Sequence, residues 1–159
     1  MTSKNQLSGG VEEKLGYAFR SPAFLEEALT HRSYANEKGL SHGNEVLALL
    51  GDAVLQFFIT ARLCQASPWQ RPGYLTEKRK SFVCEEALSE KAKHLNLGEA
   101  ILFGRGERQQ GGPLKASHLA EAFEAVIGGI YLDGGFEEAV QFLSNQFEEL
   151  KMEGDHEPD

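Results

Sequence analysis

Strand-forming residues and cysteines are both scarce in this sequence of 159 residues. Val, Ile and Thr together contribute only 14 residues, whereas the helix formers Leu, Glu and Ala contribute 56. This imbalance excludes a sheet-rich fold and predicts an all-α protein. The two cysteines, Cys64 and Cys84, are too few for a disulfide framework and lack metal-site spacing. We therefore expect reduced thiols and a cytoplasmic location.

Long apolar runs are also missing. No such run approaches the roughly 18 residues of a membrane span, and the polar segment 1–10 lacks the apolar centre of a secretion signal. The Gly-Arg-Gly at 104–106 is not a dinucleotide fingerprint, because no strand is expected before it and the third glycine is absent. We expect neither a membrane partner nor an organic cofactor.

Basic residues are in the minority, with 16 Lys and Arg against 24 Asp and Glu and a net charge of −8. This balance weakens a nucleic-acid interpretation, since phosphates attract Lys and Arg. However, six acids and one lysine fall within 148–159, so the rest of the chain carries only −3. A divalent cation bound to an acidic cluster also reverses the local charge. A nucleic-acid partner is therefore not excluded.

The hydrophobic pattern indicates one helical domain over 11–150, between a flexible N-terminus (1–10) and an acidic tail or linker start (151–159). It predicts about seven helices, at 11–15, 22–29, 45–64, 75–95, 97–103, 115–132 and 136–150, with a loop at 104–113. The helix at 45–64 is apolar on nearly every side, which is typical of a helix buried centrally or shared with a partner subunit.

Four acidic residues interrupt the two most apolar helices. Glu45 and Asp52 are seven positions apart on one helix and so point almost the same way, while Glu121 and Glu124 are one turn apart on the other. A carboxylate in an apolar stretch is costly unless it is paired or binds a metal, and facing helices with inward carboxylates form metal sites. All-oxygen ligation favours Mg²⁺ or Mn²⁺. The alternative is a buried ion pair between Asp52 and an arginine, either Arg62 or Arg79.

Several segments resemble, in order and spacing, the conserved blocks of the ribonuclease III family. They are Leu-Thr-His-Arg-Ser-Tyr at 29–34, Asn-Glu-Val-Leu-Ala-Leu-Leu-Gly-Asp-Ala-Val-Leu at 44–55, Gly-Tyr-Leu-Thr at 73–76 with Arg79, and the segments 115–125 and 128–133. The resemblance covers roughly 11–150. It implies a homodimeric, all-α endonuclease domain that cuts double-stranded RNA with Mg²⁺, which Mn²⁺ can replace.

Carried over residue by residue, the resemblance implies a metal site of Glu45, Asp52, Glu121 and Glu124, with Asp52 and Glu124 as its catalytic centre. Two ligand positions depart from the family pattern: Ala48 stands where the family has a ligating acid, and Glu121 stands where it has aspartate. Pro72 stands where the family often has an acid. Losing a ligand predicts slow cleavage or none, because even changes around the ligands cost about 10–100-fold. The alternative is a non-catalytic domain that binds structured RNA or acts as a scaffold.

Basic side chains near helix ends are the candidate RNA contacts, namely Lys78, Arg79, Arg105, Arg108 and Lys115. They would contact phosphates and 2′-hydroxyls of A-form RNA, and the alternative for each is a solvated surface charge. For His31 and Ser33 we expect a buried structural role. The family often carries a separate RNA-binding domain, and this chain stops about where the linker to it would begin. Without that domain, RNA affinity should be weak and strongly salt-dependent.

Overall fold

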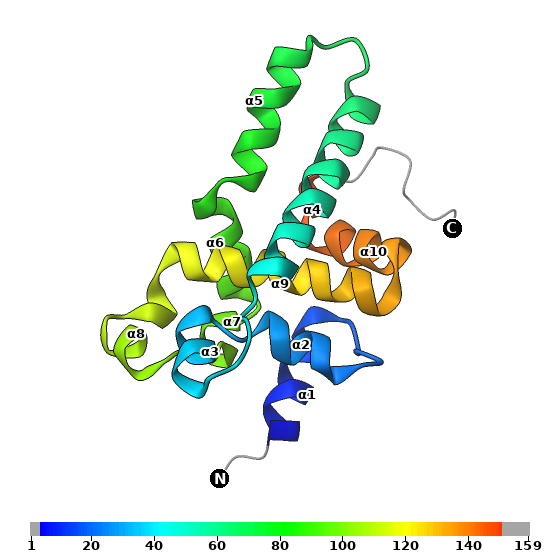
Figure 1. Ribbon diagram of the computed structural model, residues 1–159. Coiled ribbons are helices and arrows are strands. Elements are labelled where there is room, and N and C mark those ends of the chain that lie inside the picture. Colours follow the sequence, from blue (N-terminus) through cyan, green and yellow to red (C-terminus); the bar gives the residue numbers. More distant parts are fainter. Residues whose placement is uncertain (1–3, 151–159) are drawn as a thin grey trace.

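The computed structural model describes residues 4–150, and within that range the fold is all-helical, as predicted (Figure 1). Besides the α-helices, the described residues form two 3₁₀ turns, η1 (Gly112–Leu114) and η2 (Glu148–Leu150), and one isolated parallel bridge between Thr30 and Leu102. The α-helices are α1 (Lys4–Leu15), α2 (Pro22–Ala28), α3 (Arg32–Lys38), α4 (Glu45–Ala66), α5 (Pro72–Val83), α6 (Glu85–His94), α7 (Leu97–Ala100), α8 (Arg105–Gln109), α9 (Ala116–Gly134) and α10 (Phe136–Gln146).

The core is built on the two longest helices, α4 and α9, which cross (Figure 1). Helices α2, α6 and α10 pack around α9, while α5 runs beside α4. At the crossing the two backbones touch. A Cβ atom added to Gly51 would lie 1.7 Å from the carbonyl oxygen of Glu124, and one added to Gly128 would lie 2.1 Å from that of Leu47. This close approach carries Asp52, the next residue of α4, to the side of Glu124.

Several element boundaries differ from the prediction. Helix α1 begins at Lys4 rather than near residue 11. The single helix expected over 75–95 is two helices, because Cys84 is extended (φ −66°, ψ 155°) and starts α6. The short helices α3 and α8 were not predicted, and α8 occupies part of the expected loop at 104–113. The proposed acidic tail at 151–159 lies outside the described residues.

Helix α4 is long and apolar enough to cross a membrane by length and composition alone, a criterion that core helices of soluble proteins also meet. Its inner side is buried against α9. Its outer side still exposes three large apolar residues, Val46 (65% exposed), Leu49 (73%) and Phe57 (60%). Such a row is typical of a surface that another protein covers.

Candidate metal centre

A cavity of about 430 Å³ opens where α4, α6 and α9 meet. The four predicted acidic ligands all line it, so the structure brings both pairs together as the sequence predicted. The full lining is Glu45, Ala48, Leu49, Asp52, Val83, Glu85, Leu88, Ser117, Ala120, Glu121 and Glu124.

The carboxyl group of Glu124, on this cavity, has a raised pKa. Burial raises its pKa to about 7, with further contributions from the negative charges of Asp52 and Glu121. A crowd of half-buried carboxylates that repel one another is the environment that a divalent cation neutralises. Because the donors are oxygens, the residues present fit a hard cation such as Mg²⁺ or Mn²⁺.

Ala48 lies one helical turn after Glu45 and one before Asp52, and its buried methyl group borders the same cavity. It offers no oxygen to a cation. The site therefore has the shape of a four-acid centre, but one wall is apolar where the ribonuclease III resemblance expects a carboxylate.

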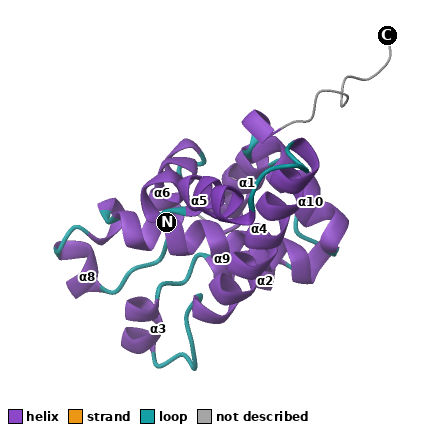
Figure 2. Ribbon diagram, turned by 90° about the horizontal axis from the view of Figure 1, so that it is seen from above, coloured by secondary structure: helices purple, strands orange, loops and turns teal. Residues whose placement is uncertain are grey.

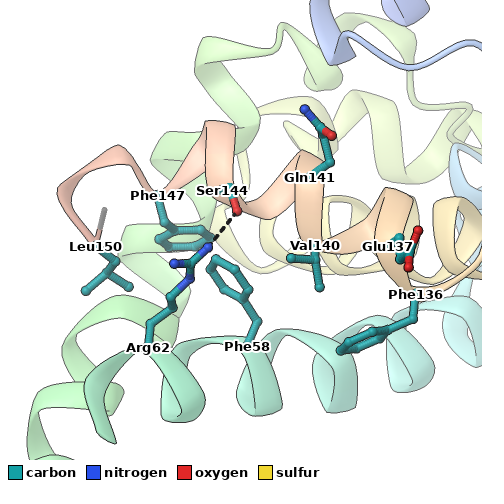
Figure 3. Close-up of a pocket in the computed structure, with 9 residues that line it drawn as sticks. All are labelled: Phe58, Arg62, Phe136, Glu137, Val140, Gln141, Ser144, Phe147 and Leu150. Carbon is teal, nitrogen blue, oxygen red and sulfur yellow. Dashed lines mark hydrogen bonds between the residues drawn. The ribbon is translucent and has the colours of Figure 1, made fainter. Parts of the chain in front are cut away.

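The two arginines of the ion-pair alternative have other partners. Arg79 donates a hydrogen bond to Thr60 Oγ1 (3.0 Å). Arg62 donates to Ser144 Oγ (3.3 Å) in a second, larger cavity of about 640 Å³ between α4 and α10, where it also lies 5.4 Å from the ring centre of Phe58 (Figure 3). Asp52 instead accepts a hydrogen bond from Gln56 Nε2 (3.3 Å). These contacts favour the metal-site interpretation over the buried ion pair.

Comparison with known proteins gives the family. Residues 21–150 match the family model described as Ribonuclease-III-like. The chain belongs to this family. It is 44% identical over 138 residues to the Ribonuclease 3 of Bdellovibrio bacteriovorus, covering 86% of this chain and 59% of the relative. It is 46% identical over 138 residues to that of Symbiobacterium thermophilum, covering 87% and 58%. The chain thus spans a little under 60% of the length of these two relatives.

Solved structures agree with this assignment. Two structures of the nuclease domain of ribonuclease III from Campylobacter jejuni superpose with TM-scores of 0.83. One is 36% identical and covers 88% of this chain and 95% of its own; the other is 33% identical and covers both chains completely. The first is described as showing flexibility in a region involved in dimer formation. The helical domain over 21–150 is therefore a ribonuclease III-like nuclease fold.

Two charged residues of this ribonuclease III-like site were missed from the sequence. Glu85, on the first turn of α6, borders the cavity. Arg32 places its guanidinium 3.9 Å from the carboxylates of both Glu45 and Glu121. Glu85 has no distinctive sequence signal, because an acid at a helix start is ordinary. Arg32 lies within the 29–34 segment that resembles the family, which gave it no role; only the packing of α3 and α6 brings both residues to the site.

A small polar network borders the start of α9. His118 contacts Glu107 Oε1 through Nε2 (2.8 Å). Lys115 binds the same carboxylate. The hydrogen bonds from Lys115 and then His118 lower the pKa of Glu107 to about 2. Lys115, a predicted RNA contact, is therefore already held by an internal acid.

His31 has the buried structural role that the sequence predicted. It is 4% exposed, and its Nδ1 accepts a hydrogen bond from the backbone N–H of Ser33, which caps the start of α3. Burial, followed by the charge of His118, lowers the pKa of His31, so the ring is neutral at pH 7.

The candidate RNA contacts do not form one patch. Lys78 and Arg79 are on α5, whereas Arg105 and Arg108 are on α8, which Figure 1 shows at another end of the molecule. Lys78 is exposed, 6.0 Å from the ring centre of Tyr74. Arg105 is 90% exposed and pairs with Glu37 at 3.9 Å. Arg108 donates a long hydrogen bond to the Ile101 carbonyl (3.5 Å).

The raised pKa of Glu124 predicts how stability depends on pH. Unfolding restores an ordinary carboxyl pKa, so the metal-free fold loses stability as pH rises from about 4.5 to about 7. His31 acts in the opposite sense, because its lowered pKa makes the fold gain stability as pH rises. The contribution of Glu124 is therefore isolated by the difference in stability between wild type and Glu124→Gln, compared at two pH values.

In thermal melts with EDTA, we expect Glu124→Gln to be more stabilised relative to wild type at pH 8 than at pH 5. Adding Mn²⁺ should raise the melting temperature of wild type more at pH 8 than at pH 5, because the cation binds the ionised carboxylate. If the difference in melting temperature between the two proteins is the same at pH 5 and pH 8, the pKa of Glu124 is not raised in the folded state.

Proposed function

We propose that this chain is the nuclease domain of an endoribonuclease that hydrolyses double-stranded RNA with Mg²⁺ or Mn²⁺, at a rate reduced by Ala48. The observation that carries the proposal is the convergence of Glu45, Asp52, Glu121 and Glu124 on one cavity. The names of the relatives, Ribonuclease 3, support the same chemistry. A cytoplasmic location is part of the proposal, motivated by the scarcity of cysteines in the sequence.

The acidic residues have separable roles in this proposal. Asp52 and Glu124 would hold the cation from the two crossing helices, and Glu121, one turn before Glu124, would bind it directly or through water. Glu45, whose side chain is 39% exposed, stands at the rim, where it would order outer waters. The bound ion would activate water and neutralise the charge that develops on the phosphate. The crossing at Gly51 keeps the carboxylates of both helices at a fixed separation.

The exposed face of α4 supports a homodimer. Val46, Leu49 and Phe57 recur along one side of the helix, and a self-complementary apolar strip closes a two-fold dimer. Leu49 also borders the acidic cavity, so this interface would adjoin the site. Two copies would present two cavities, one for each strand of a duplex.

Replacing Leu49 with aspartate should convert a dimer into a monomer, because a charge would be buried at the centre of the interface. Light scattering coupled to size exclusion measures this directly. Leu114→Asp is the matched control, since Leu114 is 85% exposed on η1 and its variant should keep the wild-type mass. A dimeric Leu49→Asp variant would place the interface elsewhere.

Cleavage of an end-labelled RNA duplex tests the proposed activity. Wild type should cut slowly in Mg²⁺ and faster in Mn²⁺, and Asp52→Asn should not cut while keeping its fold. Low salt should be used, because binding by this domain alone is expected to be weak. Cutting of a DNA duplex or of single-stranded RNA in preference to duplex RNA would contradict the proposed substrate.

The second candidate function is a non-catalytic domain that binds structured RNA or acts as a scaffold. The apolar wall at Ala48 is the observation that favours it. Duplex binding without cleavage at any concentration of Mg²⁺ or Mn²⁺ would select this candidate over the nuclease. Lys78 and Arg105 are the proposed RNA contacts that are most accessible in the monomer.

A further inference from the structure

A second group of potential metal ligands lies beside the acidic cavity. It consists of His31, which caps α3, and of His118 and Glu121 near the start of α9. One potential ligand atom from each residue lies within 4.8 Å of those from the other two. The centres of the imidazole rings are 4.2 Å apart. Helix α3 lies beside α8, which precedes α9, in both overall views (Figures 1 and 2).

His31 brings an unused ring nitrogen to this group. Its Nε2 atom is buried, and among the residues that the structure describes it has no hydrogen-bond partner. The rest of the residue is fixed. Nδ1 is 2.7 Å from Ser33 Oγ, and the backbone N–H of His31 donates to the Leu102 carbonyl at 3.0 Å. Buried polar atoms without a partner are rare in folded proteins and require an explanation; a bound ion would supply the missing partner.

We propose that His31, His118 and Glu121 bind a transition-metal ion of the zinc class, at a site next to the acidic cavity that shares Glu121 with it. Two imidazoles and one carboxylate are a donor set typical of Zn²⁺ with one open position. Imidazole suits Zn²⁺, Ni²⁺ or Cu²⁺, whereas Mg²⁺ prefers oxygen ligands. The all-oxygen cavity and this site therefore select different ions.

Neighbouring groups orient both rings for this role. Ion binding requires the tautomer that leaves the lone pair on Nε2. In that tautomer Nδ1 carries the proton and donates to Ser33 Oγ (2.7 Å), in place of the cap bond that Nδ1 accepts from the Ser33 N–H in the metal-free chain. The carboxylate of Glu107 holds the His118 ring beside His31. Hydrogen-bonded partners of this kind are usual around ligating histidines. Phe103, with its ring centre 5.1 Å from that of His31 and 5.6 Å from that of His118, supplies an apolar wall.

Sharing Glu121 couples the two sites. When Glu121 binds an ion beside the histidines, it is no longer available as a ligand in the acidic cavity. Bound zinc should therefore weaken the binding of Mn²⁺ or Mg²⁺ in that cavity. This consequence rests on the proposed nuclease function, whereas zinc binding itself does not.

Calorimetric titration of the full, metal-free chain with Zn²⁺ alone tests the site. We expect one ion per chain at the histidine site, and an affinity at least about tenfold lower in His118→Gln. His94→Gln is the matched control, because His94 is an exposed histidine on α6, and Asp52→Asn tests the acidic cavity. Both variants should keep the wild-type affinity. Wild-type affinity in His118→Gln, or loss of binding in Asp52→Asn alone, would overturn the proposal.

A measurement on the unmodified chain does not depend on how the variants fold. The sequence has five histidines, and Zn²⁺ should shift the imidazole nitrogen resonances of His31 and His118. Shifts confined to other histidines would contradict the site. Because duplex cleavage is measured separately with Asp52→Asn, a failure of the zinc site and a failure of the proposed nuclease give different results.

Discussion

Ala48→Glu is expected to accelerate duplex RNA cleavage by more than about 100-fold in Mg²⁺, because it restores a direct carboxylate ligand and even changes around ligands cost 10–100-fold. The substituted position is on the cavity wall, one turn from Asp52, and the cavity of about 430 Å³ has room for the longer side chain. The gain should be smaller in Mn²⁺, since the softer ion tolerates the incomplete site better. Wild type and variant are compared side by side on one labelled duplex in both metals.

The matched control for this prediction is Ala48→Gln, which has the same size without the charge. It should leave cleavage at the wild-type rate. Without metal, Ala48→Glu should also melt at a lower temperature than Ala48→Gln, because a further carboxylate joins the group that raises the pKa of Glu124. If neither variant cuts while both remain folded, the RNA-binding scaffold becomes the better account.

Gly51→Ala is expected to destabilise the fold by about 3 kcal/mol or more, at the upper end of the usual cost of overpacking. The added Cβ would lie 1.7 Å from the Glu124 carbonyl oxygen, which is backbone and cannot rotate away as a side chain can. Relief requires α4 and α9 to separate, and that movement would also part Asp52 from Glu124. Urea unfolding followed by circular dichroism measures the loss.

Gly106→Ala is the control for this substitution. No atom lies within 4 Å of a Cβ at position 106, and alanine is the better helix former by about 1 kcal/mol. The control should therefore be neutral or slightly stabilised. Equal stability of Gly51→Ala and wild type would contradict the close contact at the helix crossing.

The sequence was sufficient to predict the two central helices and the acidic residues that face each other from them. Both helices are long and strongly apolar, so the interrupting carboxylates stand out, and the seven-residue spacing of Glu45 and Asp52 places them on one face. The family resemblance rested on these segments together with 29–34 and 73–79. Here local pattern and tertiary structure agree: the two helices are confirmed and their acidic residues line one cavity, while the role of these residues as metal ligands stays a prediction.

The remaining features depend on packing that a local pattern does not encode. Residues 75–95 are mostly good helix formers, and the weak helix formers Ser, Phe, Val and Cys at 81–84 mark the break at Cys84 only faintly, because the helical pattern resumes directly after them. Helix α3 is capped by His31, which is not among the usual capping residues. The ion pairs of Arg32 with Glu45 and Glu121, and that of Lys115 with Glu107, join residues of separate elements. Such pairs depend on the tertiary structure and cannot be predicted from a local sequence pattern.

Manganese titration followed by the electron paramagnetic resonance of the free ion tests the central claim, which is that carboxylates on the crossing helices hold a divalent cation. At pH 8 we expect wild type to bind Mn²⁺, Ala48→Glu to bind it at least about tenfold more tightly, and Asp52→Asn and Glu124→Gln to lose most of the affinity. Equal Mn²⁺ binding by all four proteins, each verified as folded, would contradict the metal centre and with it the proposed nuclease.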